Sequence, residues 1–137
     1  MIFQLIYTCA LDTTFSQADL DEIAKTSRAW SLDKGLTGIT LWKDGSVLQV
    51  LEGEKETVTA IFEKILEDPR ILDPLILIKR TSTRREFPNW SMGYKNAKPN
   101  TTAFDLTAHS LSKALPNDVS PEINTIGRTF ARVNGLF

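Results

Sequence analysis

Residues 36–66 read LTGITLWKDGSVLQVLEGEKETVTAIFEKIL, two apolar runs followed by a helical pattern. The runs 36–42 and 46–51 are predicted strands. Asp44-Gly45 between them favours a two-residue hairpin turn of type I′, which needs positive φ at both central positions. Apolar residues then recur at i, i+3, i+4, i+7 and i+8, which predicts an amphipathic helix. They are Val58, Ile61, Phe62, Ile65 and Leu66.

The segment before this unit contains a further strand and a further helix. The apolar run 2–7 predicts the first strand of the chain. Residues 16–30 predict the first helix, which begins with Ser16 and Asp19 at the spacing of a capping box. The chain is therefore expected to alternate strand, helix, two strands and helix.

Two more strands are predicted after the central helix, at residues 75–78 and 90–94. This order is typical of an α+β protein, a ferredoxin-like β-α-β-β-α-β-β sandwich with two helices on one face of a mixed sheet. Apolar residues of the third strand point to both faces, whereas a sheet with one solvated face would alternate more cleanly. Another segment must therefore cover the face opposite the two helices.

The C-terminal part of the chain is expected to provide that cover. Residues 102–114 predict a weak helix, and Ser120-Pro121-Glu122 is typical of a helix start with proline at the first helical position. We expect a C-terminal helical extension, residues 98–137, that packs on the sheet or on a partner. The domain of residues 1–97 would precede it.

Composition argues against several classes of function. The 137 residues include 16 Lys and Arg and 17 Asp and Glu, and the net charge of −1 argues against nucleic-acid binding, which usually needs a basic surplus. Cys9 and His109 are the single cysteine and histidine, which leaves no disulfide framework and no thiolate zinc site. No apolar run approaches the ~20 residues that span a bilayer, and no signal peptide is recognisable. We expect a cytoplasmic protein without a membrane, metal or nucleic-acid partner.

Gln49 is a polar residue within an otherwise apolar strand. A buried amide needs partners for its donors and its acceptor, and an unsatisfied group costs roughly 1–3 kcal/mol. Tyr7 ends the first strand, which lies next to the third strand in this topology. The two side chains are therefore expected to meet beneath the helices, and an ordinary structural role remains open for both.

Four segments carry motifs in a particular order. They are residues 5–8 (LIYT), 36–39 (LTGI), 47–53 (VLQVLEG) and 85–92 (REFPNWSM). In this order and spacing they resemble the BLUF family, blue-light sensors that use flavin. The resemblance runs from about residue 2 to residue 95 and implies the same ferredoxin-like fold.

The resemblance implies roles for four residues. Tyr7 matches the family tyrosine that donates an electron and a proton to the flavin after illumination. Gln49 matches the glutamine that bridges this tyrosine and the flavin ring, and whose hydrogen bonds rearrange by rotation or tautomerisation. Trp90 and Met92 match the fifth-strand pair that can exchange places near the glutamine and pass the signal to the sheet.

Five further residues correspond to the flavin site. Asp68 and Arg70 match the acid and base near the ribityl-phosphate end, where arginine suits bidentate pairing with phosphate. Ser31 stands where the family usually has asparagine, and Ile71 stands where it commonly has histidine, so the grip on the flavin should weaken. Trp30, beside Ser31, is large enough to stack on the ring or to fill part of its cleft.

The resemblance implies a blue-light photoreceptor of the short stand-alone type, which is not an enzyme. It would bind oxidised FAD, with FMN as the alternative, and signal to a separate effector protein. We also expect a homo-oligomer. Two alternatives stay open. One is a degenerate BLUF-like interaction module with weak or no flavin binding. The other is a small acylphosphatase-like hydrolase, for which residues 8–12 lack a phosphate-binding loop.

Overall fold

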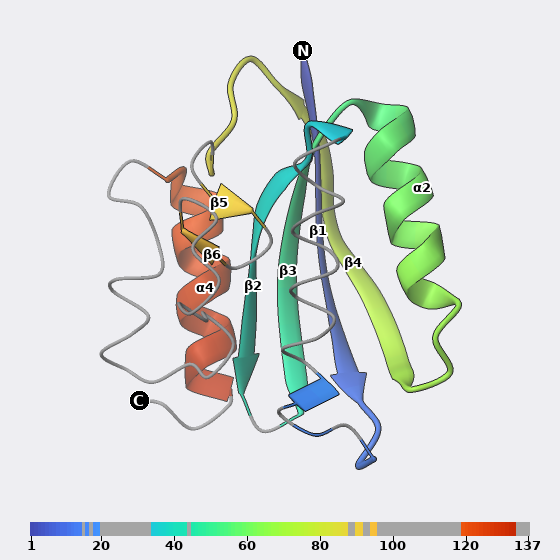
Figure 1. Cartoon of the computed structure of the whole chain (residues 1–137). Helices are drawn as coiled ribbons and strands as arrows, with labels where there is room; N and C mark the ends of the chain where they lie inside the picture. Colours follow the sequence, from blue (N-terminus) through green and yellow to red (C-terminus); the bar gives the residue numbers. More distant parts are fainter. Residues whose placement is uncertain are drawn as a thin grey trace.

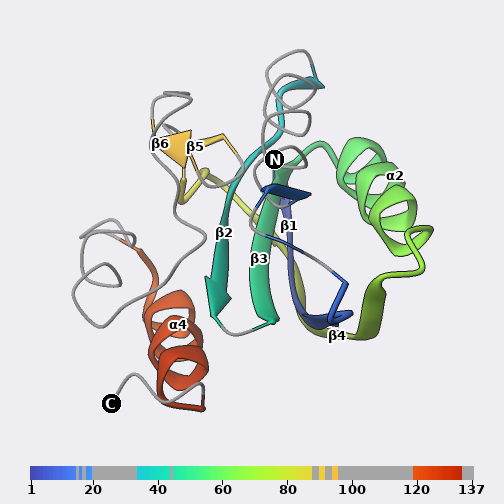
Figure 2. The same ribbon diagram turned by 60° about the horizontal axis from the view of Figure 1, so that its bottom comes forward.

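The computed structural model is built around a four-stranded sheet (Figure 1). It describes residues 1–14, 16, 18–19, 34–43, 45–87, 90–91, 94–95 and 119–133. The strands are β1 (Ile2–Leu11), β2 (Thr37–Lys43), β3 (Ser46–Gly53) and β4 (Ile71–Ser82). Helix α2 (Lys55–Leu66) lies on one side of this sheet and helix α4 (Pro121–Val133) on the other, as Figure 2 shows. Within the described residues, no helix is long and apolar enough to cross a membrane.

The strand order is β2-β3-β1-β4, which confirms the ferredoxin-like prediction. All three neighbouring pairs are antiparallel, so the expectation of a mixed sheet is wrong for this sheet. The reason lies in the crossovers. Each strand-helix-strand connection joins two parallel strands that are separated by one antiparallel strand, so parallel strands never become neighbours.

The predicted hairpin is confirmed. Lys43 pairs with Ser46, which leaves a two-residue turn, and Gly45 has a φ of 82°. Strand β4 is longer than predicted, because it continues through Asp73-Pro74. At the edge of the sheet a proline is tolerated. Asp73 has a positive φ of 49°, and the register against β1 shifts between Thr8 and Ala10 to accommodate the irregularity.

The start of the predicted first helix is also confirmed. The backbone N–H of Ser16 donates to Asp19 Oδ2 at 3.0 Å, and the backbone N–H of Asp19 donates to Ser16 Oγ at 3.2 Å. These reciprocal bonds are those of a capping box. Residues 18 and 19 are helical, whereas residues 20–30 and the predicted weak helix at 102–114 lie outside the described residues.

The predicted fifth strand is shorter than expected. Strand β5 (Trp90–Ser91) pairs antiparallel with β6 (Tyr94–Lys95), so the chain reverses between Ser91 and Tyr94. Residue 93 is a glycine, which is a turn signal within the expected strand. Strand β5 lies beside β2 (Figure 1).

Two hydrophobic clusters fill the two faces of the sheet. On the side of α2, Leu5, Tyr7 and Leu51 pack with Val58, Ile61 and Phe62 of the helix. On the side of α4, Ile6, Leu41, Leu48 and Val50 pack with Ile123 and Phe130. The prediction that both faces of β3 are buried is confirmed. Helix α4 covers the second face, while the division of the chain at residue 97 stays a prediction.

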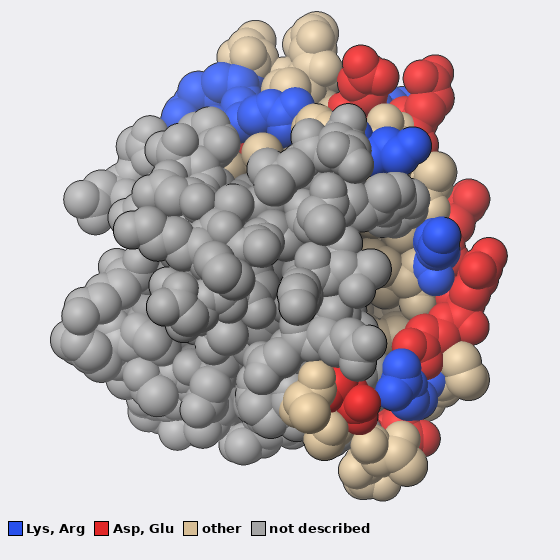
Figure 3. Space-filling view, viewed as in Figure 1, with Lys and Arg blue, Asp and Glu red and all other residues tan. Residues whose placement is uncertain are grey.

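Strand β4 forms one edge of the sheet and exposes apolar side chains. Each of these side chains is more than a third exposed. They are Leu72, Leu75, Ile76 and Leu77. On the α2 side of the molecule, acidic and basic side chains are interspersed (Figure 3).

Gly38 lies where β2 passes close to β3. A Cβ at this position would lie 1.8 Å from the carbonyl oxygen of Val50, and φ is 154°. We expect Gly38→Ala to lower the free energy of unfolding by about 2–3 kcal/mol, because the backbone of the central strand must move. Urea unfolding followed by circular dichroism would measure the loss.

The matched control for Gly38 is Gly53→Ala. The nearest atom to a Cβ at Gly53 is the carbonyl oxygen of Gly35 at 3.2 Å, so a small shift accommodates the methyl group. We expect a smaller loss of stability there. Equal losses in the two variants would contradict this explanation of the glycine in the Leu-Thr-Gly motif.

Candidate functional site

Tyr7, Gln49 and Thr40 form a hydrogen-bonded row across three adjacent strands. Tyr7 on β1 lies opposite Gln49 on β3, which in turn lies opposite Thr40 on β2. The Tyr7 hydroxyl donates to Gln49 Oε1, and Gln49 Nε2 donates to Thr40 Oγ1 at 2.8 Å. All three residues are buried. The predicted meeting of Tyr7 and Gln49 is therefore confirmed.

Thr40 was not singled out in the sequence, although a signal for it exists. A two-residue turn at residues 44–45 pairs Lys43 with Ser46, and counting back along the hairpin pairs Thr40 with Gln49. The threonine hydroxyl accepts from the amide, and because a hydroxyl can also donate, it could partner either end of Gln49. Gln49 presents its acceptor end to Tyr7 and its donor end to Thr40.

The environment of Tyr7 keeps its phenol protonated. Its ring contacts Phe62 of α2 edge-on, with ring centroids 4.9 Å apart and planes inclined by 62°. Burial raises the pKa of Tyr7 well above its usual value, and the thiol of Cys9 adds to the effect. The hydroxyl is therefore a neutral donor in the row, with a proton available for transfer.

Asp68 and Arg70 form a second polar group between α2 and β4. Arg70 Nε donates to Asp68 Oδ1 at 3.1 Å and Nη2 donates to Oδ2 at 2.9 Å, a bidentate pair. Asp19 Oδ2 lies 3.9 Å from Arg70 Nη1, and the backbone N–H of Asp12 donates to the Arg70 carbonyl. Hydrogen bonds from Arg70 lower the pKa of Asp68. The two side chains thus contact each other directly, and their role at the phosphate end of a flavin stays a prediction.

The other predicted site residues are placed less completely. Ile71 begins β4 opposite Leu11 and packs against the cluster on the α2 side. Trp90 lies in β5, and its backbone is described. Trp30, Ser31 and Met92 lie outside the described residues.

Glu52 is a fully buried carboxylate, whereas the sequence places it only near a turn beside Glu54. It follows Gln49 by three residues on β3 and accepts four hydrogen bonds. Oε1 accepts from Thr37 Oγ1 at 2.9 Å and from the backbone N–H of Phe87 at 2.7 Å. Oε2 accepts from the backbone N–H of Glu86 at 2.9 Å and from Gln4 Nε2 at 3.2 Å. Glu52 therefore ties the segment that leads to Trp90 to the strand that carries Gln49.

Arg85 strengthens the same connection. Its Nη1 donates to Thr37 Oγ1 at 2.8 Å and to the backbone carbonyl of Glu52 at 3.1 Å. The Glu-Gly part of one motif thus binds the Arg-Glu-Phe part of another. Residues 47–53 and 85–92, two of the segments that resemble the BLUF family, are therefore joined by hydrogen bonds although they are more than thirty residues apart.

Burial makes Cys9 a poor nucleophile. Desolvation raises the pKa of the Cys9 thiol to about 11. Roughly one thiol in a thousand is then ionised at pH 8, and the thiolate is the reactive form. We expect Cys9 to react with an aromatic disulfide reagent at least ~100-fold more slowly in the folded protein than in 6 M guanidinium chloride. Equal rates in the two conditions would contradict the burial of this thiol.

The ferredoxin-like sandwich and its buried tyrosine–glutamine pair define a class of small α+β domains. Comparison with family models agrees, because residues 2–93 match the model "BLUF: Sensors of blue-light using FAD". The chain belongs to the BLUF family, whose domains are blue-light sensors that bind flavin.

Solved structures of the same fold include several BLUF proteins. BlrB, a BLUF protein in its dark state, superposes with a TM-score of 0.70 at 26% identity, and the match covers 96% of this chain and 96% of BlrB. A bacterial light-regulated adenylyl cyclase gives a TM-score of 0.69 at 25% identity over 97% of this chain and 34% of that one. Klebsiella pneumoniae BlrP1 with FMN and cyclic diGMP gives a TM-score of 0.72 at 25% identity, and the match covers 96% of this chain and 35% of that one.

Curated relatives are much longer than this chain. The photoactivated adenylate cyclase subunit beta of Euglena longa is 28% identical over 89 residues, which is 64% of this chain and 10% of that protein. The corresponding subunit of Euglena gracilis matches to the same extent. The chain therefore spans about a tenth of the length of these relatives.

Proposed function

We propose that this protein is a blue-light photoreceptor in which Tyr7 and Gln49 respond to light absorbed by a bound oxidised flavin. The observation that carries the proposal is the buried row from Tyr7 through Gln49 to Thr40. It offers a protonated phenol and an amide with one end facing that phenol. Membership of the BLUF family supports the assignment of the pair.

The residues of the site fit a flavin. Gln49 is buried, and within the described part of the chain its two-donor Nε2 makes one hydrogen bond, to Thr40. The amide thus has a donor to offer a ring carbonyl or nitrogen. A bound flavin would supply the light-absorbing ring and the electron acceptor.

In this proposal Tyr7 would donate an electron and its hydroxyl proton, the proton along its hydrogen bond to Gln49 Oε1, and a bound flavin would take up both. The Gln49 amide then rotates or changes tautomer. Because the two ends of an amide have opposite hydrogen-bonding character, either change alters what Gln49 presents to Tyr7 and to Thr40. The altered pairing would be passed to Trp90, in β5, and to Met92.

We assign the remaining flavin contacts to Trp30, Ser31, Asp68, Arg70 and Ile71. The guanidinium of Arg70 would pair with the phosphate end of FAD, or of FMN, while it keeps its hydrogen bonds to Asp68. Trp30 and Ser31 would contact the ring, and Ile71 would contribute an apolar wall. The protein would act in the cytoplasm as a homo-oligomer that signals to a separate effector protein.

The decisive experiment is an absorption spectrum of the purified protein before and after blue light. We expect a flavin spectrum that shifts slightly to the red on illumination and returns in the dark. A colourless protein that takes up no flavin when refolded with FAD would refute the proposal. Phosphate analysis of the released flavin would distinguish FAD from FMN.

A degenerate interaction module is the second candidate function. The observation that favours it is Ile71, which packs against the apolar cluster where the family commonly has histidine. The double variant Ser31→Asn, Ile71→His tests it by flavin uptake. A parent protein already saturated with flavin, with uptake unchanged in the variant, would exclude this candidate.

A further inference from the structure

A polar network joins the sheet to the first turn of α4. Glu86 is buried, and its Oε1 accepts from the backbone N–H of Ser120 at 2.8 Å. Its Oε2 accepts from Ser120 Oγ at 3.1 Å and from Arg80 Nη2 at 3.3 Å. Arg80 Nη2 also donates to Ser120 Oγ at 3.0 Å. Ser120, the residue directly before α4, is therefore held by one buried carboxylate and one guanidinium.

The same network returns to β3. Arg80 Nε donates to Gln4 Oε1 at 2.7 Å, and Gln4 Nε2 donates to Glu52. Glu52 accepts in turn from the backbone N–H of Glu86. Gln4, Glu52, Arg80 and Glu86 thus close a ring of hydrogen bonds. A displacement of β3 or of the segment before Trp90 must change the position of the Glu86 carboxylate, and with it Ser120.

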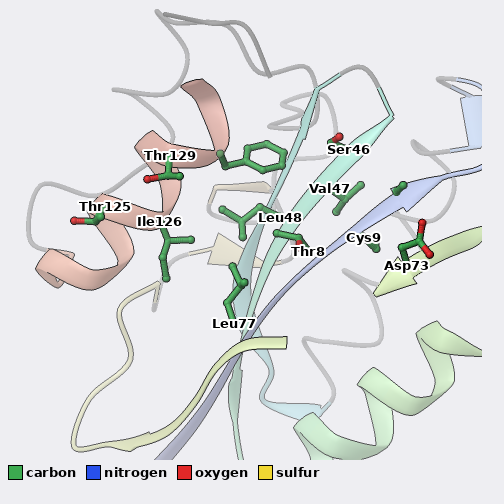
Figure 4. A pocket seen from close by; sticks show the side chains of 12 residues that line it. Thr8, Cys9, Ser46, Val47, Leu48, Asp73, Leu77, Thr125, Ile126 and Thr129 are labelled. Atoms are coloured by element: carbon green, nitrogen blue, oxygen red, sulfur yellow. The ribbon is translucent and has the colours of Figure 1, made fainter. Parts of the chain in front are cut away.

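The C-terminal half of α4 is held differently. A cavity of about 620 Å³ opens between the middle of α4 and the sheet (Figure 4). Side chains from β1, β3, β4 and α4 line it, among them Thr8, Leu48, Leu77, Ile126 and Thr129. Phe130 packs with Leu48 beside this cavity, so α4 is held by hydrogen bonds at its N-terminus and by apolar contacts further along.

We propose that Glu86 is a positioning residue that couples the sheet to α4, so that rearrangement at Gln49 moves this helix over the cavity. The light-dependent part of this inference rests on the proposed function. Glu52 transmits the position of β3 to the backbone of residues 86 and 87. Glu86 transmits it to Ser120, and α4 presents the change to the effector.

The test uses two substitutions at Ser120. Ser120 is the N-cap of α4, since its Oγ accepts from the Ile123 N–H at 3.4 Å. Ser120→Asp preserves a capping oxygen but puts a second carboxylate against Glu86, where it also competes with Glu86 for Arg80. Ser120→Thr preserves both the cap and the hydroxyl and is the matched control. Glu86→Gln combined with Ser120→Asp removes the repulsion and should restore the contact.

Hydrogen exchange of residues 121–133 in the flavin-loaded full chain, in the dark and in blue light, is the readout. We expect the exchange of α4 in the parent and in Ser120→Thr to change on illumination. In Ser120→Asp we expect exchange at least tenfold faster in the dark and no further change in light, with an unaltered red shift. The combination with Glu86→Gln should recover the light dependence.

Two results would overturn the inference. One is a light-dependent exchange in Ser120→Asp equal to that in Ser120→Thr. The other is an α4 whose exchange does not respond to light in a parent protein that shows the red shift. A parent without a red shift would refute the proposed function instead. The dark comparison of Ser120→Asp with Ser120→Thr would still decide whether Glu86 holds the helix.

Discussion

The Gln49→Leu protein is expected to bind flavin and to show no red shift under blue light. Leucine fills a similar volume but provides no acceptor for Tyr7 and no donor for Thr40, so no hydrogen bond can exchange between the two states. Tyr7→Phe is expected to abolish the shift as well, because it removes the transferable proton. Difference spectra at saturating blue light would measure both losses.

Two further variants make this result specific. Tyr94→Phe alters the second tyrosine of the chain, which lies in β6, and should leave the red shift intact. Thr40→Val removes the acceptor of Gln49 Nε2, and we expect a shift of altered size or recovery rate rather than its loss. A full red shift in Gln49→Leu would show that the row of Tyr7, Gln49 and Thr40 is structural only.

The second large effect is expected at Glu52. Glu52→Leu should lower the free energy of unfolding by about 3–5 kcal/mol, because it leaves four buried or partly buried donors without their acceptor. Two of these donors are backbone N–H groups that cannot turn toward other partners. Urea unfolding monitored by tryptophan fluorescence would give the change in stability.

Glu54→Leu is the matched control for Glu52. Glu54 lies two residues further along and is exposed, so its replacement should change stability by less than about 0.5 kcal/mol. If Glu52→Leu cost no more than Glu54→Leu, the carboxylate would not be the anchor of residues 86 and 87. The network that we infer to reach α4 would then lack its support on β3.

The parts of the fold that the sequence predicted are those set by local chemistry. The hairpin at Asp44-Gly45, the helix beginning at Pro121 and the capping box at Ser16 each depend on residues close together in the chain. The meeting of Tyr7 and Gln49 was also predictable, because topology and pleat together determine which side chains share a face.

The buried network around Glu52 could not be predicted in the same way. Its members come from residues 4, 37, 52, 80, 86 and 120, and nothing local distinguishes Glu52 from the exposed Glu54. Only the assembled sheet shows which carboxylate is surrounded by donors. The length of β4 escaped prediction for another reason, since Asp73-Pro74 is a turn signal that an edge strand can accommodate.

The edge strand β4 has a consequence for the behaviour of the protein at high concentration. A long edge strand with exposed leucine and isoleucine side chains is the kind of segment that recruits further strands into fibrils. Pro74 offers no N–H to an incoming strand, and the positive φ of Asp73 bends the backbone beside it. Growth by strand addition is therefore interrupted in the middle of the segment. Strand addition to this edge is confined to the part of β4 that follows Pro74.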